Sequence, residues 1–337
     1  MGIAVVTGSA SGIGAAVRAR LEKDGDRVVG IDLRGAEIEA DLGSADGRAA
    51  AVAGAREAAG GAIDRLVLCA GVGSHLADLP LVPSVNYFGT LTLLDGLRDA
   101  QAGRPGAAAV VVASNSAQIG GFDEHPYVQA MLDDDEARAR ELIASENGFL
   151  AYAGSKHAVA RAVRRRAAAF GEAGVRLNAI APGPTETPMV EATRAHPVFG
   201  KAMGDLPIPL GRFGQPHEIA AAIAFLLGPE ASYVRLGRAR SPDRGSPMLL
   251  EGKTVLVSGV GAGLGREVAQ AALADGANLV LGARTETVLA ETAAQLDPNG
   301  KRVAWRATDI TKPADCEALV AAGVERFGRI DALVQVA

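Results

Sequence analysis

The sequence of 337 residues contains only two cysteines, Cys69 and Cys316, which lie far apart in unrelated contexts. This pair excludes a disulfide framework and a cysteine-based metal site, and it is typical of a reducing compartment. No apolar stretch reaches the roughly 20 residues needed to cross a bilayer, and the N-terminus shows no signal sequence. Positive charge is not in excess either, since the net charge is −5. We therefore predict a cytoplasmic protein that binds neither membrane nor nucleic acid.

Aromatic residues are equally scarce, at 4% of the chain, although 48% of the residues are hydrophobic. Such a core is built from small aliphatic residues, which suit helices packed on a buried parallel sheet. Strands are predicted at residues 3–7, 27–31, 65–69, 108–113 and 175–180. Helices are predicted at residues 12–23, 84–100, 150–171 and 216–227. Their alternation predicts an α/β fold with a Rossmann-like, doubly wound parallel sheet.

The sequence begins the same kind of unit twice. Residues 2–14 read GIAVVTGSASGIG and residues 252–265 read GKTVLVSGVGAGLG. Between them, residues 235–250 are basic, rich in Gly, Ser and Pro, and without hydrophobic period, which predicts a linker. We therefore predict a first domain at residues 1–234 and an appended partial second Rossmann unit at residues 251–337. The second unit stops after its fourth strand, before any catalytic set.

A glycine-rich turn follows the first predicted strand. Gly8, Gly12 and Gly14 allow the backbone to turn tightly and approach a pyrophosphate, which would rest on the first NH groups of the helix. A plain turn is the alternative. Asp32 ends the next strand, near the roughly 20-residue spacing expected of the residue that holds the adenosine ribose. Its carboxylate would repel a 2′-phosphate by roughly 4 kcal/mol at about 4 Å, which favours NAD over NADP.

Tyr152 and Lys156 open an alanine-rich predicted helix, and their i, i+4 spacing places both side chains on one face. Lys156 can lower the pKa of the phenol from its usual value of ~10. Tyr152 can then exchange a proton with a substrate oxygen, as a general acid or base. This pair is the strongest catalytic signal in the chain.

Three further segments support this pair. Ser114 ends a predicted strand and can hydrogen-bond the substrate oxygen, although a helix or turn cap is its alternative role, and Asn115 or Ser116 could be mistaken for it. Asn86 lies on a predicted helix whose backbone can hold a water that links the lysine to solvent. Pro182-Gly183 follows another strand and forms a turn expected over the nicotinamide pocket.

These residues, in this order, resemble those of the short-chain dehydrogenase/reductase family, and the resemblance covers residues 1–234. The stretches LVLCAG, SVNYFG, LAYAGSK and IAPGPTETP are similar to the bacterial 3α-hydroxysteroid dehydrogenase/carbonyl reductase group. The resemblance implies a catalytic tetrad of Asn86, Ser114, Tyr152 and Lys156. It also implies an NAD site formed by the glycine turn, the following strand ends and the catalytic pair: Gly8, Ser11, Gly12, Ile13, Gly14, Asp32, Asp41, Leu42, Cys69, Ala70, Gly71, Tyr152, Lys156, Pro182, Gly183, Thr185 and Thr187.

The expected function is interconversion of a secondary alcohol and a ketone with NAD(H), on a 3α-hydroxysteroid or a similarly bulky hydrophobic compound. Another alcohol, such as an aromatic allylic one, is the nearest alternative, and a catalytically inactive nucleotide-binding fusion protein is the more distant one. Family members usually associate, so a homodimer or homotetramer is expected. No metal site is expected, because the acidic run Asp133–Glu136 lacks ligand spacing and suits a helix start.

Two features depart from the family pattern. Residues 122–148 form an insertion, which we expect to cover a face used elsewhere for assembly and to shape the substrate entrance. After Val234 the family continues into a seventh, edge strand, whereas this chain reads Arg235-Leu236-Gly237-Arg238. Losing that strand forfeits roughly 5–10 kcal/mol of burial, out of a total stability of about 5–15 kcal/mol. The first domain is therefore expected to be poorly stable.

The second unit resembles only the opening of the family pattern. Ser258–Gly265 repeats the glycine turn, and Asp309-Ile310 matches the adenine-flanking position. Arg284, near the tip of the second strand of this unit, would favour a 2′-phosphate and hence NADP. A fusion or truncation product of two adjacent reading frames is the expected origin of this arrangement.

Overall fold

The computed structural model describes residues 2–118, 121–204, 206, 208, 210–234, 250–261 and 263–336. The chain divides into two compact units, Met1–Ala239 and Arg240–Ala337. The predicted linker at 235–250 lies outside the described residues except for Leu250, which packs against the core of the second unit. The departure at Arg235–Arg238, where we expect this chain to lack the seventh strand of the family, also lies outside them.

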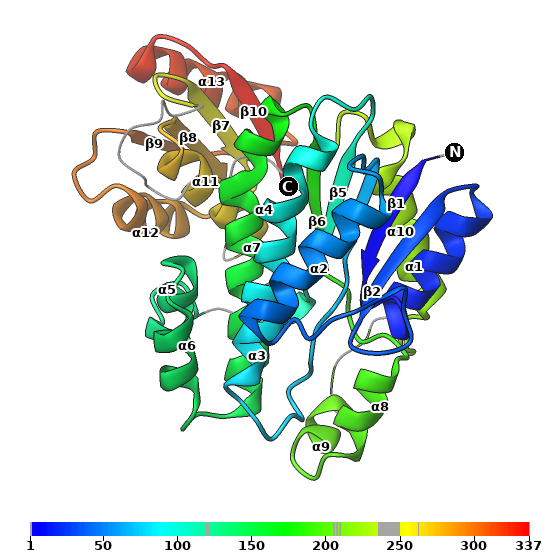
Figure 1. Ribbon diagram of the computed structural model, residues 1–337. Coiled ribbons are helices and arrows are strands. Elements are labelled where there is room, and N and C mark those ends of the chain that lie inside the picture. The colour runs from blue at the N-terminus through cyan, green and yellow to red at the C-terminus, as the bar shows by residue number, and fades with distance from the viewer. Residues whose placement is uncertain are drawn as a thin grey trace. The chain divides into compact units, whose positions relative to one another are not determined.

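A six-stranded parallel sheet in the order β3-β2-β1-β4-β5-β6 forms the centre of the first unit (Figure 1). Its strands are β1 (Ile3–Thr7), β2 (Arg27–Asp32), β3 (Ile38–Glu39), β4 (Arg65–Leu68), β5 (Ala108–Val112) and β6 (Arg176–Ile180). Every predicted strand is present, with ends that differ by at most one residue. Only the two-residue β3 was not predicted, because so short a strand has no alternating pattern to reveal it.

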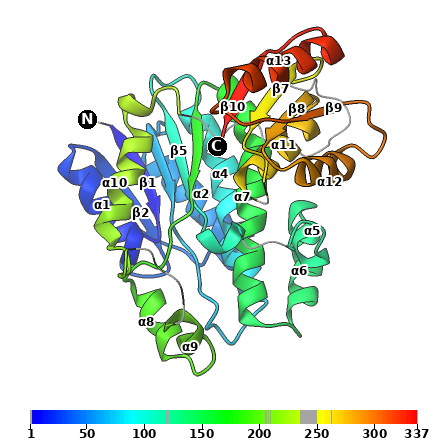
Figure 2. The same ribbon diagram turned by 180° about the vertical axis from the view of Figure 1, so that it is seen from behind.

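Helices cover both faces of this sheet, as Figures 1 and 2 show from opposite sides. On one face lie α1 (Gly12–Lys23) and α10 (Pro216–Leu227), and on the other lie α2 (Ala45–Ala58), α4 (Thr90–Gln101) and α7 (Gly148–Glu172). Successive strand residues point to opposite faces, so Val5 enters one hydrophobic core while Ala4 and Val6 enter the other. The predicted doubly wound α/β fold is confirmed.

The helix predicted at residues 84–100 is wrong in its first part. The chain instead forms α3 (Leu81–Pro83) and a π-helical turn, η1 (Ser84–Gly89), before α4 begins. The hydroxyl of Thr90 donates to the carbonyl of Asn86 at 2.8 Å, and Gly89 lies so close to Leu42 that an added Cβ would be 3.1 Å from its Cβ. Side-chain bonds of this kind compete with the regular helical ladder, and π-turns occur frequently at functional sites.

The insertion before α7 forms two short helices, α5 (Pro126–Leu132) and α6 (Glu136–Ile143). Tyr127 of α5 donates its phenolic hydrogen to the carbonyl of Ala151 on α7, at 3.0 Å. Asp135 caps α6 by accepting a hydrogen bond from the NH of Arg138 at 2.9 Å, so the acidic run does mark a helix start. The insertion therefore covers one side of α7, and its effect on assembly stays a prediction.

The segment after β6 contains α8 (Pro188–Ala195), α9 (Phe199–Gly204), α10 and η3 (Pro229–Ala231). Arg176, the first residue of β6, donates to the carbonyls of Leu226, Leu227, Gly228 and Ala231 at 2.6–3.1 Å. The carbonyls of Leu226, Leu227 and Gly228 lie at the end of α10, where a cation also offsets the partial negative charge of the helix dipole, and that of Ala231 lies at the end of η3. Within the described residues, β6 pairs only with β5 and is the edge of the sheet.

The second unit has a four-stranded parallel sheet in the order β10-β7-β8-β9. Its elements are β7 (Thr254–Ser258), α11 (Leu264–Ala274), β8 (Asn278–Ala283), α12 (Glu286–Leu296), β9 (Val303–Ala307), α13 (Pro313–Phe327) and β10 (Ala332–Gln335). Gly265 repeats the close approach of a glycine turn, since an added Cβ would lie 2.3 Å from the carbonyl oxygen of Gly259. Among the described helices of both units, none has the length and apolar character needed to cross a membrane.

Candidate active site

The predicted site segments follow four neighbouring strands at the same edge of the sheet. Thr7, at the end of β1, lies beside Leu68, and Val112, at the end of β5, lies beside Ile180. The strand order reverses at β1, which pairs with β2 on one side and β4 on the other. Ligands of open α/β sheets bind at such a point, beyond the carboxyl ends of the strands.

The glycine turn has the backbone geometry that a dinucleotide requires. Gly8 and Gly12 have φ angles of 66° and 53°, a region that favours glycine. A Cβ on Gly14 would lie 2.0 Å from the carbonyl oxygen of Gly8, so the turn packs directly on the start of α1. Ser11 is the N-cap of α1, and Ile13 packs against the core beneath it. These residues fit a pyrophosphate at the helix N-terminus.

Thr7 ties the glycine turn to the next strand end and was not identified from the sequence. Its hydroxyl oxygen accepts hydrogen bonds from the NH groups of Cys69 and Ala70, at 3.1 and 3.0 Å. An added Cβ on Gly71 would lie 3.1 Å from Oδ1 of Asn86 and 3.4 Å from Nζ of Lys156. The small residues after β4 therefore border both the turn and the catalytic side chains. Its role could have been predicted from the sequence, because Thr7 directly precedes Gly8 of the glycine turn.

Hydrogen bonds fix the side chain of Asp32 beside the glycine turn. Its two carboxylate oxygens accept hydrogen bonds from the NH groups of Ala10, at 2.9 Å, and Leu33, at 2.7 Å. The predicted adenine-flanking pair lies further along the chain, where Asp41 accepts a hydrogen bond from the NH of Gly43 at 2.9 Å and Leu42 is buried. The carboxylate of Asp32 is thus fixed beside the glycine turn.

The loop after β6 reaches the same edge. The carbonyl of Pro182 accepts a backbone NH from the loop after β5 at 3.0 Å, and the hydroxyl of Thr185 donates to the carbonyl of Gly183 at 2.9 Å. Thr187 is the N-cap of α8. An added Cβ on Gly12 would lie 3.2 Å from Cγ2 of Thr187. The structure therefore brings the start of α8 against the glycine turn.

Tyr152 and Ser114 meet at this edge. Ser114 is buried and lies near the phenol of Tyr152, which itself is partly buried. Burial raises the pKa of Tyr152, and the hydroxyl of Ser114 opposes this rise. The hydroxyl of Ser116 donates to that of Ser114 at 3.0 Å.

Lys156 is buried, and its ammonium group donates to the carbonyl of Val112 at 2.9 Å. Burial lowers the pKa of Lys156 to about 8, because a charged amine loses solvation there. The predicted lowering of the phenol pKa by this lysine stays a prediction.

Asn86 holds the loop after β4 with its side chain. Its amide exchanges two hydrogen bonds with the backbone of Val72, at 2.8 and 3.1 Å, and donates a third to Oγ of Ser155 at 3.1 Å. Ser155 in turn donates to the carbonyl of Tyr152 at 2.7 Å. The backbone carbonyl of Asn86 accepts a hydrogen bond from the hydroxyl of Thr90 at 2.8 Å, and the water expected on this helix backbone stays a prediction. Asn86 is thus linked to the catalytic helix through Ser155.

Cys69 lies near Lys156 but is not set up as a nucleophile. Burial raises the pKa of its thiol to about 12, and the positive charge of Lys156 offsets only part of this rise. A thiol with so high a pKa stays protonated at neutral pH. Cys69 is therefore not supported as a nucleophile, and its place beside the cofactor stays a prediction. Among the described residues, no group of three or more His, Cys, Asp or Glu side chains is placed to hold a metal ion.

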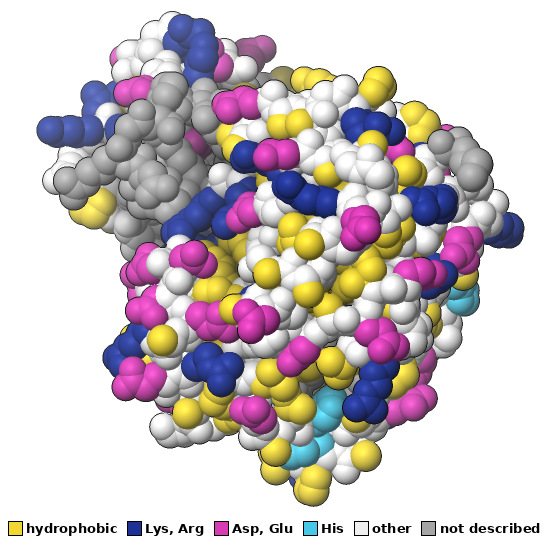
Figure 3. Space-filling model, viewed as in Figure 1, with side chains coloured by type: hydrophobic (Ala, Val, Ile, Leu, Met, Phe, Trp, Pro, Cys, Tyr) yellow, Lys and Arg dark blue, Asp and Glu magenta, His cyan; other side chains and the backbone are white. Residues whose placement is uncertain are grey.

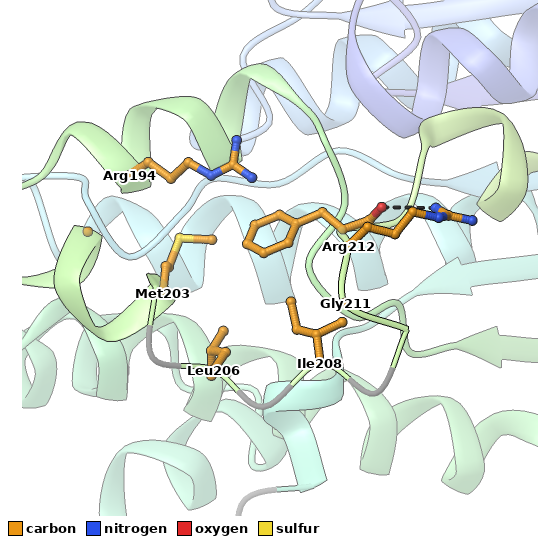
Figure 4. A pocket seen from close by; sticks show the side chains of 8 residues that line it. Arg194, Met203, Leu206, Ile208, Gly211 and Arg212 are labelled. Atoms are coloured by element: carbon orange, nitrogen blue, oxygen red, sulfur yellow. Dashed lines mark hydrogen bonds between the residues drawn. The ribbon is translucent and has the colours of Figure 1, made fainter.

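A pocket of about 460 Å³ lies between α8, α9 and the segment that leads to α10, outside the four tetrad residues (Figure 4). Figure 4 shows Arg194, Met203, Leu206 and Ile208 gathered around it. The guanidinium of Arg194 pairs with Glu186 and lies 4.2 Å from the ring centroid of Phe213. Sequence reasoning missed this pocket, because its residues come from an irregular segment.

The pocket segment is joined to the active-site loops. His75, in the loop after β4, hydrogen-bonds Oγ1 of Thr193 on α8 at 3.0 Å. Gly73 lies so close to α8 that an added Cβ would be 2.9 Å from Cγ of Met189. The helix α8, which contributes Arg194 to the pocket, therefore contacts the loop that follows Cys69-Ala70-Gly71. On the described part of the face in Figure 3, acidic and basic side chains are interspersed.

Comparison with known proteins gives related matches for both units. A family model described as short chain dehydrogenase matches residues 253–337, and one described as Enoyl-(Acyl carrier protein) reductase matches residues 137–240. The 3-alpha-hydroxysteroid dehydrogenase/carbonyl reductase of Comamonas testosteroni is 47% identical over 237 residues, which cover 69% of this chain and 92% of that protein. A short-chain type dehydrogenase/reductase of Sinorhizobium fredii is 27% identical and aligns with 98% of this chain and 63% of its own length.

Solved structures agree with these matches. The 3-alpha-hydroxysteroid dehydrogenase of Pseudomonas sp. B-0831, solved as a complex with NADH, has 49% identity and a TM-score of 0.68, with 69% of this chain and 92% of that chain covered. The fold, the order of the site segments and these similarities agree. The chain is an oxidoreductase that belongs to the short-chain dehydrogenase/reductase family.

Proposed function

We propose that the first unit interconverts a secondary alcohol and a ketone with NAD(H), and that Asn86, Ser114, Tyr152 and Lys156 form its catalytic set. The observation that carries this proposal is the proximity of Ser114 to the phenol of Tyr152, at the sheet edge where the glycine turn also lies. A phenol paired with a hydroxyl can exchange a proton with a substrate oxygen, and the adjoining turn can hold a dinucleotide.

NAD would be held by the glycine turn, Asp32, the small residues after β4, and the segment from Pro182 to Thr187. This assignment is supported by the 2.0 Å approach that only a glycine at position 14 permits and by the fixed carboxylate of Asp32. When bound, the nicotinamide ring supplies the acceptor for the hydride that leaves the alcohol carbon. The similar enzyme of Pseudomonas sp. B-0831, solved with NADH, also supports this choice.

The protein side of the reaction is a proton transfer. In the oxidative direction Tyr152 takes the proton of the alcohol hydroxyl, and Ser114 orients the same oxygen. Because burial raises the pKa of Tyr152, a positive charge near the phenol must favour its ionised form during turnover. Lys156, one helical turn along α7, is the source of that charge within the chain. Asn86 supports the helix through Ser155.

A bulky hydrophobic substrate, such as a 3α-hydroxysteroid, fits the apolar lining that Met203, Leu206, Ile208 and Phe213 give to the pocket beside the active-site loops. The proposal is tested by adding NAD and a 3α-hydroxysteroid to the full chain and following NADH absorbance, with an aromatic allylic alcohol in parallel. Turnover of the steroid alone supports the proposed substrate class. Turnover of the allylic alcohol alone replaces that class, and no turnover with either favours the inactive nucleotide-binding alternative.

Asp32 is expected to set the cofactor preference. Replacing Asp32 with asparagine keeps the shape of the side chain but removes its charge. At most roughly 4 kcal/mol of repulsion toward a 2′-phosphate is then lost. We expect the preference for NADH over NADPH to fall by about tenfold or more, as measured by calorimetric titration of the full chain. Asp24→Asn, at the opposite end of α1, removes the same charge and should leave the preference unchanged. An unaltered preference in Asp32→Asn would contradict the assignment.

Three further expectations stay proposals of the same kind. They are a cytoplasmic location, association into a homodimer or homotetramer, and NADP as the nucleotide that Arg284 would favour in the second unit. The poor stability expected of the first unit also stays a prediction.

A further inference from the structure

The inserted helix α6 contacts the π-helical turn that carries Asn86. Arg140 of α6 donates from Nη1 to the hydroxyl oxygen of Ser84 at 2.8 Å. Ser84 is the first residue of η1, and Asn86 follows two residues later. This hydrogen bond joins residues 56 positions apart, and it connects the insertion with the turn that carries Asn86.

A buried arginine also connects α6 with η1. Arg48 of α2, only 6% exposed, donates to the backbone carbonyl of Ser84 at 3.2 Å. Its guanidinium also makes two hydrogen bonds, of 2.6 and 3.1 Å, to the carboxylate of Glu136 at the start of α6. A buried guanidinium requires a paired carboxylate. Glu136 of the insertion therefore fixes the side chain of Arg48, which in turn donates to Ser84.

The chain of contacts continues from Ser84 to the catalytic helix. Within η1, the amide of Asn86 makes two hydrogen bonds with the backbone of Val72 and donates a third to Ser155. Ser155 in turn donates to the carbonyl of Tyr152. A π-turn is less regular than an α-helix and needs outside contacts to keep its geometry. The insertion supplies two such contacts, one to the hydroxyl and one, through Arg48, to the carbonyl of Ser84.

We propose that Arg140 and Glu136 are positioning residues, which fix the π-turn and thereby place Asn86 for the proton relay. The inserted helices α5 and α6 are then part of the support of the active site, in addition to covering α7. This inference rests on the proposed catalytic set. It concerns residues that touch neither substrate nor cofactor and act through Ser84.

The test compares two arginines of the same helix in the full chain. Arg140→Met removes the contact to Ser84, whereas Arg138→Met removes an exposed arginine that pairs only with Glu141 among the described residues. We expect Arg140→Met to lower kcat about tenfold, because small displacements of catalytic groups can cost up to about 100-fold. Its Kd for NADH and its Tm should match those of Arg138→Met, and Arg140→Lys should recover part of kcat.

Ser84→Ala tests the same contact from the other side. Since Arg140 and Ser84 act through one hydrogen bond, the double variant should lose no more activity than the worse single variant. Equal kcat in Arg140→Met and Arg138→Met, or full additivity with Ser84→Ala, would overturn the inference. If instead wild-type turnover survives Tyr152→Phe, the proposed catalytic set itself is wrong, and this outcome is distinguishable because it does not involve α6.

Discussion

Replacing Tyr152 with phenylalanine is expected to lower kcat by about 10²–10⁴-fold, the usual contribution of a positioned acid or base. The change removes only the phenolic oxygen beside Ser114 and keeps the aromatic ring. Binding of NADH should stay nearly intact, because no cofactor contact of the glycine turn is altered. Steady-state turnover and calorimetric NADH titration of the same preparation check both parts.

Tyr127→Phe provides a matched control. This variant also deletes one buried phenolic oxygen, which donates to the carbonyl of Ala151, but it lies on α5 outside the proposed catalytic set. Losing that hydrogen bond should cost about 1 kcal/mol of stability and leave kcat within a small factor of wild type. Turnover by Tyr152→Phe at the rate of Tyr127→Phe would exclude Tyr152 as the acid or base.

A methyl group at position 14 is expected to abolish NADH binding by the first unit. In Gly14→Ala the new Cβ would lie 2.0 Å from the carbonyl oxygen of Gly8 and 2.6 Å from its carbonyl carbon. These are backbone atoms of the turn, which cannot rotate away as a flexible side chain could. The turn must therefore move away from α1, and we expect at least about a 100-fold loss of affinity, which corresponds to about 2.7 kcal/mol.

Gly265→Ala is the matched variant in the second unit, where the new Cβ would lie 2.3 Å from the carbonyl oxygen of Gly259. It introduces the same clash but leaves the first glycine turn untouched. NADH affinity and turnover should therefore equal those of wild type. If Gly265→Ala loses NADH binding and Gly14→Ala keeps it, the NADH site belongs to the second unit and the assignment made here is reversed.

Most of the sheet and two of the helices could be predicted because their patterns are local. Aliphatic runs such as the one from Ile3 to Val6 appear at each buried strand, and α1 and α10 begin and end where predicted. The glycine turn could also be located, since a strand, a tight turn and a helix N-terminus follow one another directly. In each case neighbouring residues determine the conformation.

Features that depend on distant residues could not be predicted. The pair of Arg48 and Glu136 joins positions 88 apart, and the π-turn at Ser84–Gly89 depends on contacts from α6 and Leu42. The pocket between α8 and α9 is formed by an irregular segment without a periodic pattern. The hydrogen bond from Lys156 to the carbonyl of Val112 also joins positions 44 apart, and no local pattern indicates it.

The hydrogen bonds of Arg176, at the start of β6, determine which part of the first unit depends on the sequence that follows it. All four carbonyls that Arg176 binds belong to residues before Val234, so these hydrogen bonds need no residue of the second unit. A different sequence joined after position 234 would therefore leave the guanidinium at the end of α10 with the same four partners.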